Sequence, residues 1–139
     1  MTQDATLARF VEAQAKIYET ALSEIRAGAK RSHWMWFIFP QLRGLGHSPT
    51  AHYYGIASLS EARSYLDHPV LGQRYLNCVK ALQALAGSDP VAVFGSVDAM
   101  KLRSSLTLFE AAGGPALLGD ALERWFDGER DASTLHLLA

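Results

Sequence analysis

Hydrophobic residues recur every three or four positions along most of the chain, which is the period of an amphipathic helix. Glycine, proline and small polar residues separate these stretches. No stretch shows the sustained alternation that marks a half-buried strand. The pattern predicts helices over about 4–27, 59–66, 69–86, 97–112, 115–127 and 131–138, with one further turn at 91–94. We therefore expect an all-α, compact single domain over residues 1–139, an orthogonal or irregular bundle of about six helices.

Local signals mark several of the predicted helix ends. Asp4 can cap the first helix, and Gly28 can end it in a left-handed conformation. Ser58 and Glu61 have the three-residue spacing of a capping box at the start of the next helix. His68 stands before a proline, where we expect a cap or turn residue. These signals concern the ends of helices and leave their packing open.

One short apolar run interrupts the helical period. Residues 34–39 read Trp-Met-Trp-Phe-Ile-Phe, and Pro40 ends the run because proline lacks an amide hydrogen and disfavours helical geometry before it. A run of this length fits either a buried strand or a buried helical turn. We expect Trp36, Phe37 and Phe39 to be mostly buried, with an aromatic residue of segment 50–57 or of the 122–126 helix in contact. Replacing Trp36 by alanine would then cost about 3–5 kcal/mol.

The polar residues on either side of this run allow two interpretations. The run is either part of the core with a solvated rim, or one wall of a pocket for a planar, anionic ligand. In the second case Trp34 or Trp36 would stack against the ring of the ligand. The cations that would meet its phosphate are Lys30, Arg31 and Arg43. Glycines at 44 and 46 would let the following loop approach the ligand closely.

A second polar cluster lies in the predicted 97–112 helix. Lys101, Ser104 and Ser105 stand at positions i, i+3 and i+4, and Asp98 lies one turn earlier, so the spacing predicts one shared face. The predicted core-facing residues of this helix are Leu102, Leu106 and Phe109. The polar face is either a site for a ligand or an ordinary solvated face. In the latter case an Asp98–Lys101 pair would contribute only about 0.3–0.5 kcal/mol.

Several blocks of the sequence together resemble a known bacterial family. These blocks are Trp34-Met35-Trp36-Phe37-Ile38-Phe39-Pro40-Gln41-Leu42, Tyr54-Gly55-Ile56, His68-Pro69 with Leu71-Gly72, and Phe94-Gly95-Ser96 followed by Asp98, Lys101, Ser104 and Ser105. They are similar to the DUF1810 family, a domain of unknown function that sometimes carries a calpastatin label. The resemblance implies a compact, largely helical fold and no established activity. The calpastatin label does not fit, because such an inhibitor would be a disordered, proline-rich repeat chain.

Composition narrows the function classes. At 139 residues with 49% hydrophobic residues, the chain is long and apolar enough to form one core. A net charge of −1 makes nucleic acid an improbable partner, and no run is long enough for a membrane helix, so we expect a cytoplasmic protein without membrane contact. The five histidines lack metal-site spacing, and no Walker or dinucleotide-binding motif occurs, so we assign no metal and no cofactor. The single cysteine, Cys78, fits a buried apolar position.

Two functional hypotheses remain. The first is a domain that binds or hydrolyses a nucleotide-like or ADP-ribose-like ligand, by analogy with the helical NADAR-type N-glycosidases. Its loop 40–47 and helix 98–105 would face each other across a polar cleft, with Asp98 and Lys101 as candidate catalytic residues. Glu61 is the alternative carboxylate for acid–base work. The candidate ligand-binding residues are Lys30, Arg31, His33, Trp34, Gln41, Arg43, His47, Ser104 and Ser105. The second hypothesis is a non-catalytic interaction module or homodimer, so whether the protein is an enzyme stays open.

Overall fold

The computed structural model describes residues 3–139, with side chains described from Thr6 onward. Within this range the chain forms ten helices and no strand, which confirms the all-α class but not the number of about six. The helices are α1 (Gln3–Gln14), α2 (Tyr18–Arg26), α3 (Met35–Ile38), α4 (Pro49–Tyr54), α5 (Leu59–Asp67), α6 (Leu71–Gln83), α7 (Pro90–Phe94), α8 (Ser96–Ala111), α9 (Ala116–Phe126) and α10 (Ala132–Leu138). The predicted cap at Asp4 concerns a side chain outside the described residues.

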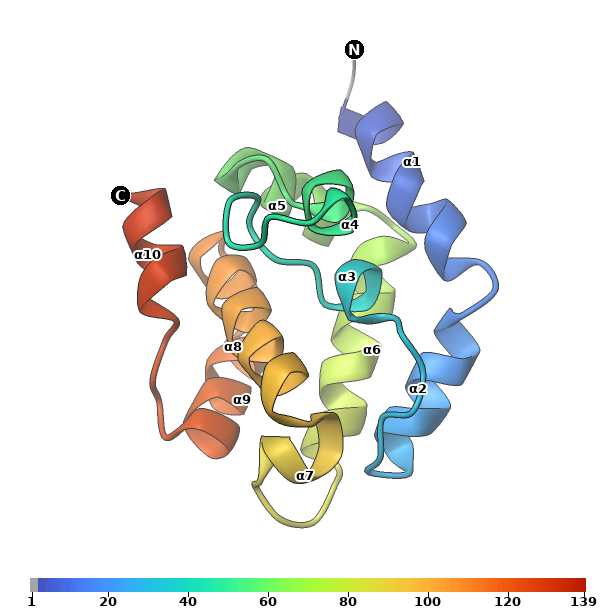
Figure 1. The fold of residues 1–139 in the computed structure, drawn as a ribbon, viewed down its shortest axis with the longest axis vertical. Coiled ribbons are helices and arrows are strands. Elements are labelled where there is room, and N and C mark those ends of the chain that lie inside the picture. The colour runs from blue at the N-terminus through green and yellow to red at the C-terminus, as the bar shows by residue number, and fades with distance from the viewer. Residues whose placement is uncertain (1–2) are drawn as a thin grey trace.

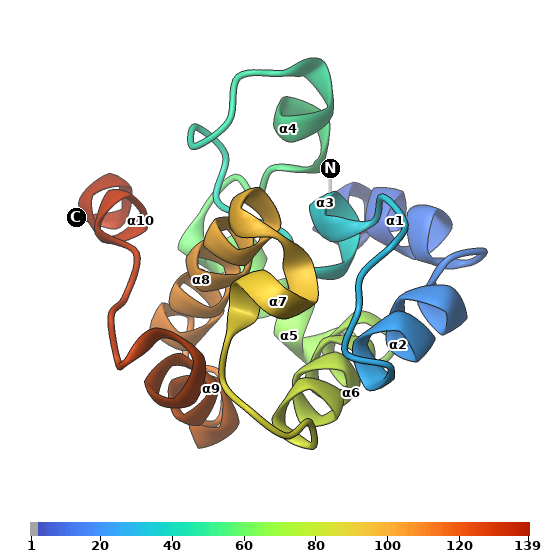
Figure 2. The ribbon, with the colours of Figure 1, turned by 60° about the horizontal axis from the view of Figure 1, so that its bottom comes forward.

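Two long helices organise the bundle. Helix α6 packs against α2, α5 and α9, while α8 packs against α5, α7, α9 and α10 (Figure 1). Helix α4 and the loop before it project from one end of the bundle, and α10 lies along its outer side (Figure 2). The fold therefore brings the loop before α4 and the helix α8 near the same end, although they are far apart in sequence.

Aromatic rings connect the helices across the core. Phe10 of α1 meets the ring of Tyr65 edge-on with centroids 5.2 Å apart, and Tyr65 lies 5.1 Å from Phe109 of α8. Phe109 also contacts Tyr75 of α6 at 4.6 Å, and Tyr75 contacts Phe39 at 5.5 Å. Such tilted and edge-on pairs stabilise a core beyond the area that they bury. These contacts fix α1, α5, α6 and α8 around one column of rings.

The long N-terminal helix predicted over 4–27 is in fact two helices. Helix α1 ends at Gln14 and α2 begins at Tyr18, although neither glycine nor proline separates them. The Gln14 side chain is buried, and its Nε2 donates hydrogen bonds to the Phe37 carbonyl at 2.7 Å and to the Tyr65 hydroxyl at 3.0 Å. Helix α1 packs on α3 and α5, whereas α2 packs on α6. The break lets each half reach its own neighbours.

The side chains of the aromatic run are buried to different depths. Phe39 is fully buried and Phe37 packs against the core, with its ring 5.3 Å from Tyr54 of α4 as expected for a contact with segment 50–57. Trp36 has the same intermediate burial as Phe37, so it is mostly but not fully buried, and it lines a cleft. Trp34 takes the core position and is 0% exposed. Helix α3 is a single turn, so adjacent residues point in different directions.

Glu24 of α2 anchors the segment that leads into this run. Its carboxylate accepts hydrogen bonds from the Arg31 and Ser32 amides, the Ser32 hydroxyl and the Trp34 indole, at 2.6–2.9 Å. Burial opposes ionisation of this carboxyl, but the four hydrogen bonds outweigh it and lower the pKa of Glu24 to about 2. The ionised carboxylate therefore stabilises the folded loop.

Acid is expected to weaken this anchor. The pKa of Glu24 in the folded protein lies below its usual value of 4.5, so its stabilisation is complete above about pH 5 and is lost as the pH falls towards 2. We expect Glu24→Gln to be less stable than the wild type at pH 7. The difference between their urea midpoints should shrink from about pH 5 to about pH 3. Ser32→Ala, which keeps the carboxylate, should retain most of the pH dependence, and a constant Glu24→Gln difference would contradict this account.

Candidate functional site

A cleft of about 290 Å³ lies between the loop that follows Pro40 and the first half of α8. It is called the Trp36 cleft below. Its lining residues are Trp36, Gln41, Leu45, Gly46, Val97, Met100, Lys101, Ser104, Asp131 and Ser133. The loop and α8 thus stand on two sides of one hollow, and the start of α10 contributes a third side.

Trp36 is the central wall of this region. Besides the cleft, it lines two smaller adjoining hollows, one towards Lys30 and one towards Tyr54. The Lys101 ammonium lies over the Trp36 ring, 3.8 Å from its centroid, which is a close cation–π contact. Gly46 allows the loop to lie close to Ala51 of α4, because a Cβ there would stand 2.8 Å from the Ala51 Cβ; the Trp36 ring is 4.0 Å away. The partly exposed indole of Trp36, with Lys101 on its face, therefore lies in a concave setting.

One carboxylate holds two lysines beside the cleft. Asp98 Oδ2 lies 2.8 Å from Lys30 Nζ, and Asp98 Oδ1 lies 3.5 Å from Lys101 Nζ. The Lys30 side chain is only 7% exposed, and its ammonium also donates to the Ser32 carbonyl and lies over the Trp34 ring. Lys30 is thus fixed in place, whereas Lys101 borders the open cleft. The cluster of two cations and one anion carries a net positive charge.

The other predicted site residues are distributed unevenly. Gln41 and Ser104 line the Trp36 cleft, with the Ser104 hydroxyl donating to the Met100 carbonyl at 3.1 Å. His33 is exposed and lines the smaller hollow beside Lys30. Arg31 and His47 are exposed and lie outside the lining of the described hollows.

Three of the predicted site residues lie in surroundings that differ from those expected. Ser105 does not share the face of Lys101: it is 0% exposed, and its hydroxyl lies 2.9 Å from the Tyr75 hydroxyl. Helix α8 is surrounded by neighbours, so a polar residue on it does not mark an exposed face. Trp34 is fully buried, so its ring offers no open face to a ligand. Arg43 turns away from the cleft and lines another hollow.

The sequence did not single out several residues that line the cleft. Val97 and Met100 of α8 are 65% and 62% exposed. Leu45 and Asp131 complete the lining from the loop and the residue before α10. Their only sequence signal is proximity to the glycine-rich loop and to a helix start. Nothing in the sequence pairs the residues before α10 with α8.

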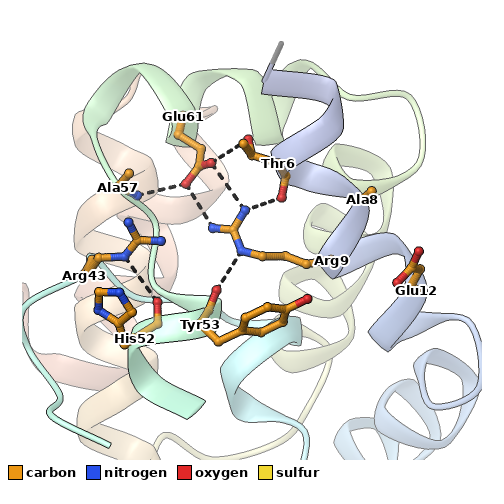
Figure 3. A pocket seen from close by; sticks show the side chains of 9 residues that line it. All are labelled: Thr6, Ala8, Arg9, Glu12, Arg43, His52, Tyr53, Ala57 and Glu61. Atoms are coloured by element: carbon orange, nitrogen blue, oxygen red, sulfur yellow. Dashed lines mark hydrogen bonds and ion pairs between the residues drawn. The ribbon is translucent and has the colours of Figure 1, made fainter. Parts of the chain in front are cut away.

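Arg43 belongs to a second hollow of about 550 Å³, which lies between α1, α4 and the start of α5 (Figure 3). It is called the Arg43 hollow below. Its lining residues are Thr6, Ala8, Arg9, Glu12, Arg43, His52, Tyr53, Ala57 and Glu61. The sequence places Arg9 on the polar face of the first predicted helix, where solvent contact is expected. In the structure, Arg9 instead spans the floor of the hollow.

Arg9 uses all of its hydrogen-bonding capacity within the protein. Its Nη1 donates to the Thr6 carbonyl and to Glu61 Oε2, and its Nη2 donates to the Gly55 carbonyl and to Glu61 Oε1. Its Nε donates to the Tyr53 carbonyl at 2.8 Å. Arg9 therefore connects α1 to α5 and to the end of α4.

Glu61 is the buried partner of this arginine. Its residue is 5% exposed, and its carboxylate also accepts from the Ala57 amide at 2.8 Å and from the Thr6 hydroxyl at 2.9 Å. Burial would raise the pKa of Glu61, but the Arg9 guanidinium and the other donors outweigh burial and lower it. The carboxylate is therefore held in its ionised form as part of the structure.

At Gly55 the segment that follows α4 lies directly against the segment that follows Pro40. A Cβ on Gly55 would stand 2.8 Å from Arg43 Cβ and 2.9 Å from the Ala51 carbonyl oxygen, so only glycine fits. The close approach permits a short parallel bridge between Leu42 and Ile56. It also leaves the Gly55 carbonyl facing both Arg9 and Arg43.

Other kinds of site are not evident in the described part of the chain. Among the side chains described from Thr6 onward, no group of three or more His, Cys, Asp or Glu is placed to hold a metal ion. The helices described there are too short or too polar to span a membrane. Cys78 is fully buried, and burial raises the pKa of its thiol to about 12, so a thiolate nucleophile is disfavoured.

Comparisons with known proteins agree with the predicted resemblance. The sequence profile of the DUF1810 family, described as a protein of unknown function, matches residues 4–138. The chain is 47% identical to the conserved hypothetical protein Rv1873 from Mycobacterium tuberculosis, over 95% of each chain, and its fold matches that crystal structure with a TM-score of 0.93. A comparison with curated proteins gives no match. These similarities establish the helical fold and carry no ligand or reaction with them.

Proposed function

The chain belongs to the DUF1810 family, whose function is unknown, and on that premise we propose that it binds a small phosphorylated ligand with a flat ring, of the nucleotide kind, in the Trp36 cleft. The observation that carries this proposal is the partly exposed Trp36 ring with the Lys101 ammonium on its face. An indole face binds planar rings and cations alike, and the neighbouring cation suits a phosphate.

The size and polarity of the cleft support a mononucleotide-sized ligand. Its volume of about 290 Å³ is at the lower end of the range for small-molecule sites, which suits AMP better than the larger ADP-ribose. The Gln41 side chain offers an amide donor and acceptor at the wall opposite α8. A ring that enters the cleft would displace Lys101 from the indole face and leave its ammonium free to pair with the phosphate.

The geometry supports binding more strongly than hydrolysis. Both Asp98 oxygens face lysine ammonium groups, an arrangement that suits the electrostatic positioning of those lysines. A catalytic role of Asp98 and Lys101 therefore remains a prediction. In the proposed function, Asp98 positions Lys101, and Lys101 binds the ligand.

Binding of AMP, adenosine and ADP-ribose to the purified protein tests this proposal. By calorimetry, Trp36→Ala should weaken AMP binding about tenfold or more, because base stacking on an aromatic side chain contributes about 1–3 kcal/mol. Lys101→Met should weaken AMP binding but not adenosine binding. Lys80→Met, which removes an exposed lysine of α6, is the matched control and should leave both affinities unchanged. Circular dichroism verifies that each variant is folded.

Two outcomes would refute the proposal. One is the absence of saturable binding of AMP and ADP-ribose to the wild-type protein. The other is an AMP affinity that Trp36→Ala leaves unchanged, because the ring would then lie elsewhere.

One observation favours an interaction module as the second candidate. The exposed Val97 and Met100 side chains border the cleft. Leu137 of α10, which is 48% exposed, lines an adjoining hollow that shares Leu45 and Ser133 with the cleft. Exposed apolar side chains that gather beside a groove are typical of protein contacts. If sedimentation shows a homodimer that Met100→Glu dissociates, and no nucleotide binds, this second candidate replaces the first.

A further inference from the structure

We propose that the Arg43 hollow is a second binding site, which takes the oxyanion group of a small molecule, either a phosphate or a carboxylate. This site is separate from the Trp36 cleft, and the proposal does not depend on the function assigned to that cleft. It rests on the way the Arg43 guanidinium is held, on the balance of charge in the hollow and on the size of the hollow.

The Arg43 guanidinium is fixed with one of its binding edges open. Its Nε donates to the His52 carbonyl and its Nη2 donates to the Gly55 carbonyl, both at 3.2 Å. These bonds occupy the edge formed by Nε and Nη2. The edge formed by Nη1 and Nη2 has no partner among the described residues, and it presents two parallel N–H groups. Such an edge matches the two oxygens of a carboxylate or phosphate.

The charges of the hollow leave Arg43 without a counter-ion. The floor pairs Arg9 with Glu61 at 3.2 Å, so these two charges cancel. Arg43 has no carboxylate within ion-pair distance among the described residues. Glu12 stands at the far rim, beyond Arg9 in Figure 3. The two arginines and two glutamates that line the hollow sum to zero formal charge, so the uncompensated positive charge is local to Arg43.

Two guanidinium groups converge on one atom at this place. Arg9 Nη2 and Arg43 Nη2 both donate to the Gly55 carbonyl oxygen, at 3.0 and 3.2 Å. The Glu61 carboxylate neutralises the charge of Arg9 but does not face Arg43, so the two guanidinium groups still repel each other. A bound oxyanion would supply the missing negative charge. The carbonyls of His52 and Gly55 hold Arg43 beforehand, so little side-chain entropy is lost on binding.

The ligand is expected to be larger than a free ion. The hollow measures about 550 Å³, well beyond what a phosphate fills. The Tyr53 ring is part of a residue that is 54% exposed, and it lies along the wall below Arg9 in Figure 3. The body of the molecule would lie against this ring while its oxyanion binds Arg43.

Nuclear magnetic resonance tests the site with simple probes. We expect inorganic phosphate or acetate, titrated at constant ionic strength, to shift the Arg43 Nε–H signal in a saturable way, with a dissociation constant of about 1–10 mM. Arg43→Gln should abolish saturable shifts at the neighbouring Ala57 amide. Arg43→Lys should weaken binding about tenfold, because a lysine lacks the paired donors. Arg26→Gln, which removes an exposed arginine of α2, is the control and should change the affinity less than about twofold.

The controls separate this site from the Trp36 cleft. Trp36→Ala should leave the phosphate titration unchanged even if it abolishes AMP binding, so each proposal can fail alone. A stronger response to phosphate identifies a phosphate ester as the ligand class, and a stronger response to acetate identifies a carboxylate. Shifts that fail to saturate, that chloride reproduces, or that Arg26→Gln reduces as much as Arg43→Gln would overturn the proposal.

Discussion

Replacing Trp34 by alanine is expected to lower the free energy of unfolding by about 3–5 kcal/mol, the range for truncating a fully buried aromatic side chain. Trp34 is 0% exposed, its ring contacts Phe39 and Phe94 at centroid distances of 6.3 Å, and its indole N–H donates to Glu24 at 2.9 Å. The change would remove the ring, create a cavity and deprive the Glu24 carboxylate of one donor. Urea unfolding at pH 7 measures the effect.

Trp36→Ala is the matched control for this experiment. The two tryptophans are two residues apart, and Trp36 is only partly buried, so its loss should cost less than about 2 kcal/mol. The large effect that the sequence assigned to Trp36 thus belongs to Trp34. Equal destabilisation by the two substitutions would show that burial does not set the difference.

Breaking the Arg9–Glu61 ion pair should be comparably severe. Glu61→Ala is expected to cost about 3–5 kcal/mol, because removing one partner leaves the other charge buried and uncompensated. The side chains are only 11% and 6% exposed, and Glu61 also accepts from Thr6 and Ala57. The double variant with Arg9→Ala should be less destabilised than the two single variants added together, which chemical denaturation of all four proteins measures.

A more exposed ion pair of the same protein is the control. Arg130 and Glu110 lie closer together, at 2.6 Å, but their side chains are 29% and 32% exposed. Glu110→Ala should cost less than about 1 kcal/mol, since solvent screens the pair. If Glu110→Ala and Glu61→Ala destabilise the protein equally, burial is not the deciding factor.

Helix ends were predictable because their causes are local. Ser58 accepts from the Glu61 amide at 3.1 Å, His68 Nδ1 accepts from the Leu71 amide at 3.2 Å, and Asp131 accepts from the Thr134 amide at 3.0 Å. Each interaction joins residues three apart, so the sequence contains both partners in one short window. Gly28 ends α2 with a positive φ of 71° for the same reason.

The break between α1 and α2 and the environment of α8 depend on distant partners. Gln14 follows the apolar period of a helix, but its buried amide binds Phe37 and Tyr65, which are 23 and 51 positions away. Ser105 shares a predicted face with Lys101, but it packs on Tyr75 from another helix. For the candidate site, the sequence predicted that the loop after Pro40 and α8 would lie on two sides of one cleft. Which side chains face the cleft was decided by tertiary contacts that no local pattern contains.

The segment from Gln41 to Tyr53 contributes to both hollows, since Gln41, Leu45 and Gly46 line one while Arg43, His52 and Tyr53 line the other. The two proposed binding sites therefore share one segment of the chain. Any ligand that changes the conformation of this segment from one hollow alters the free energy of binding in the other. Thermodynamic linkage makes the effect reciprocal, so the factor by which an oxyanion changes nucleotide affinity equals the factor by which the nucleotide changes oxyanion affinity.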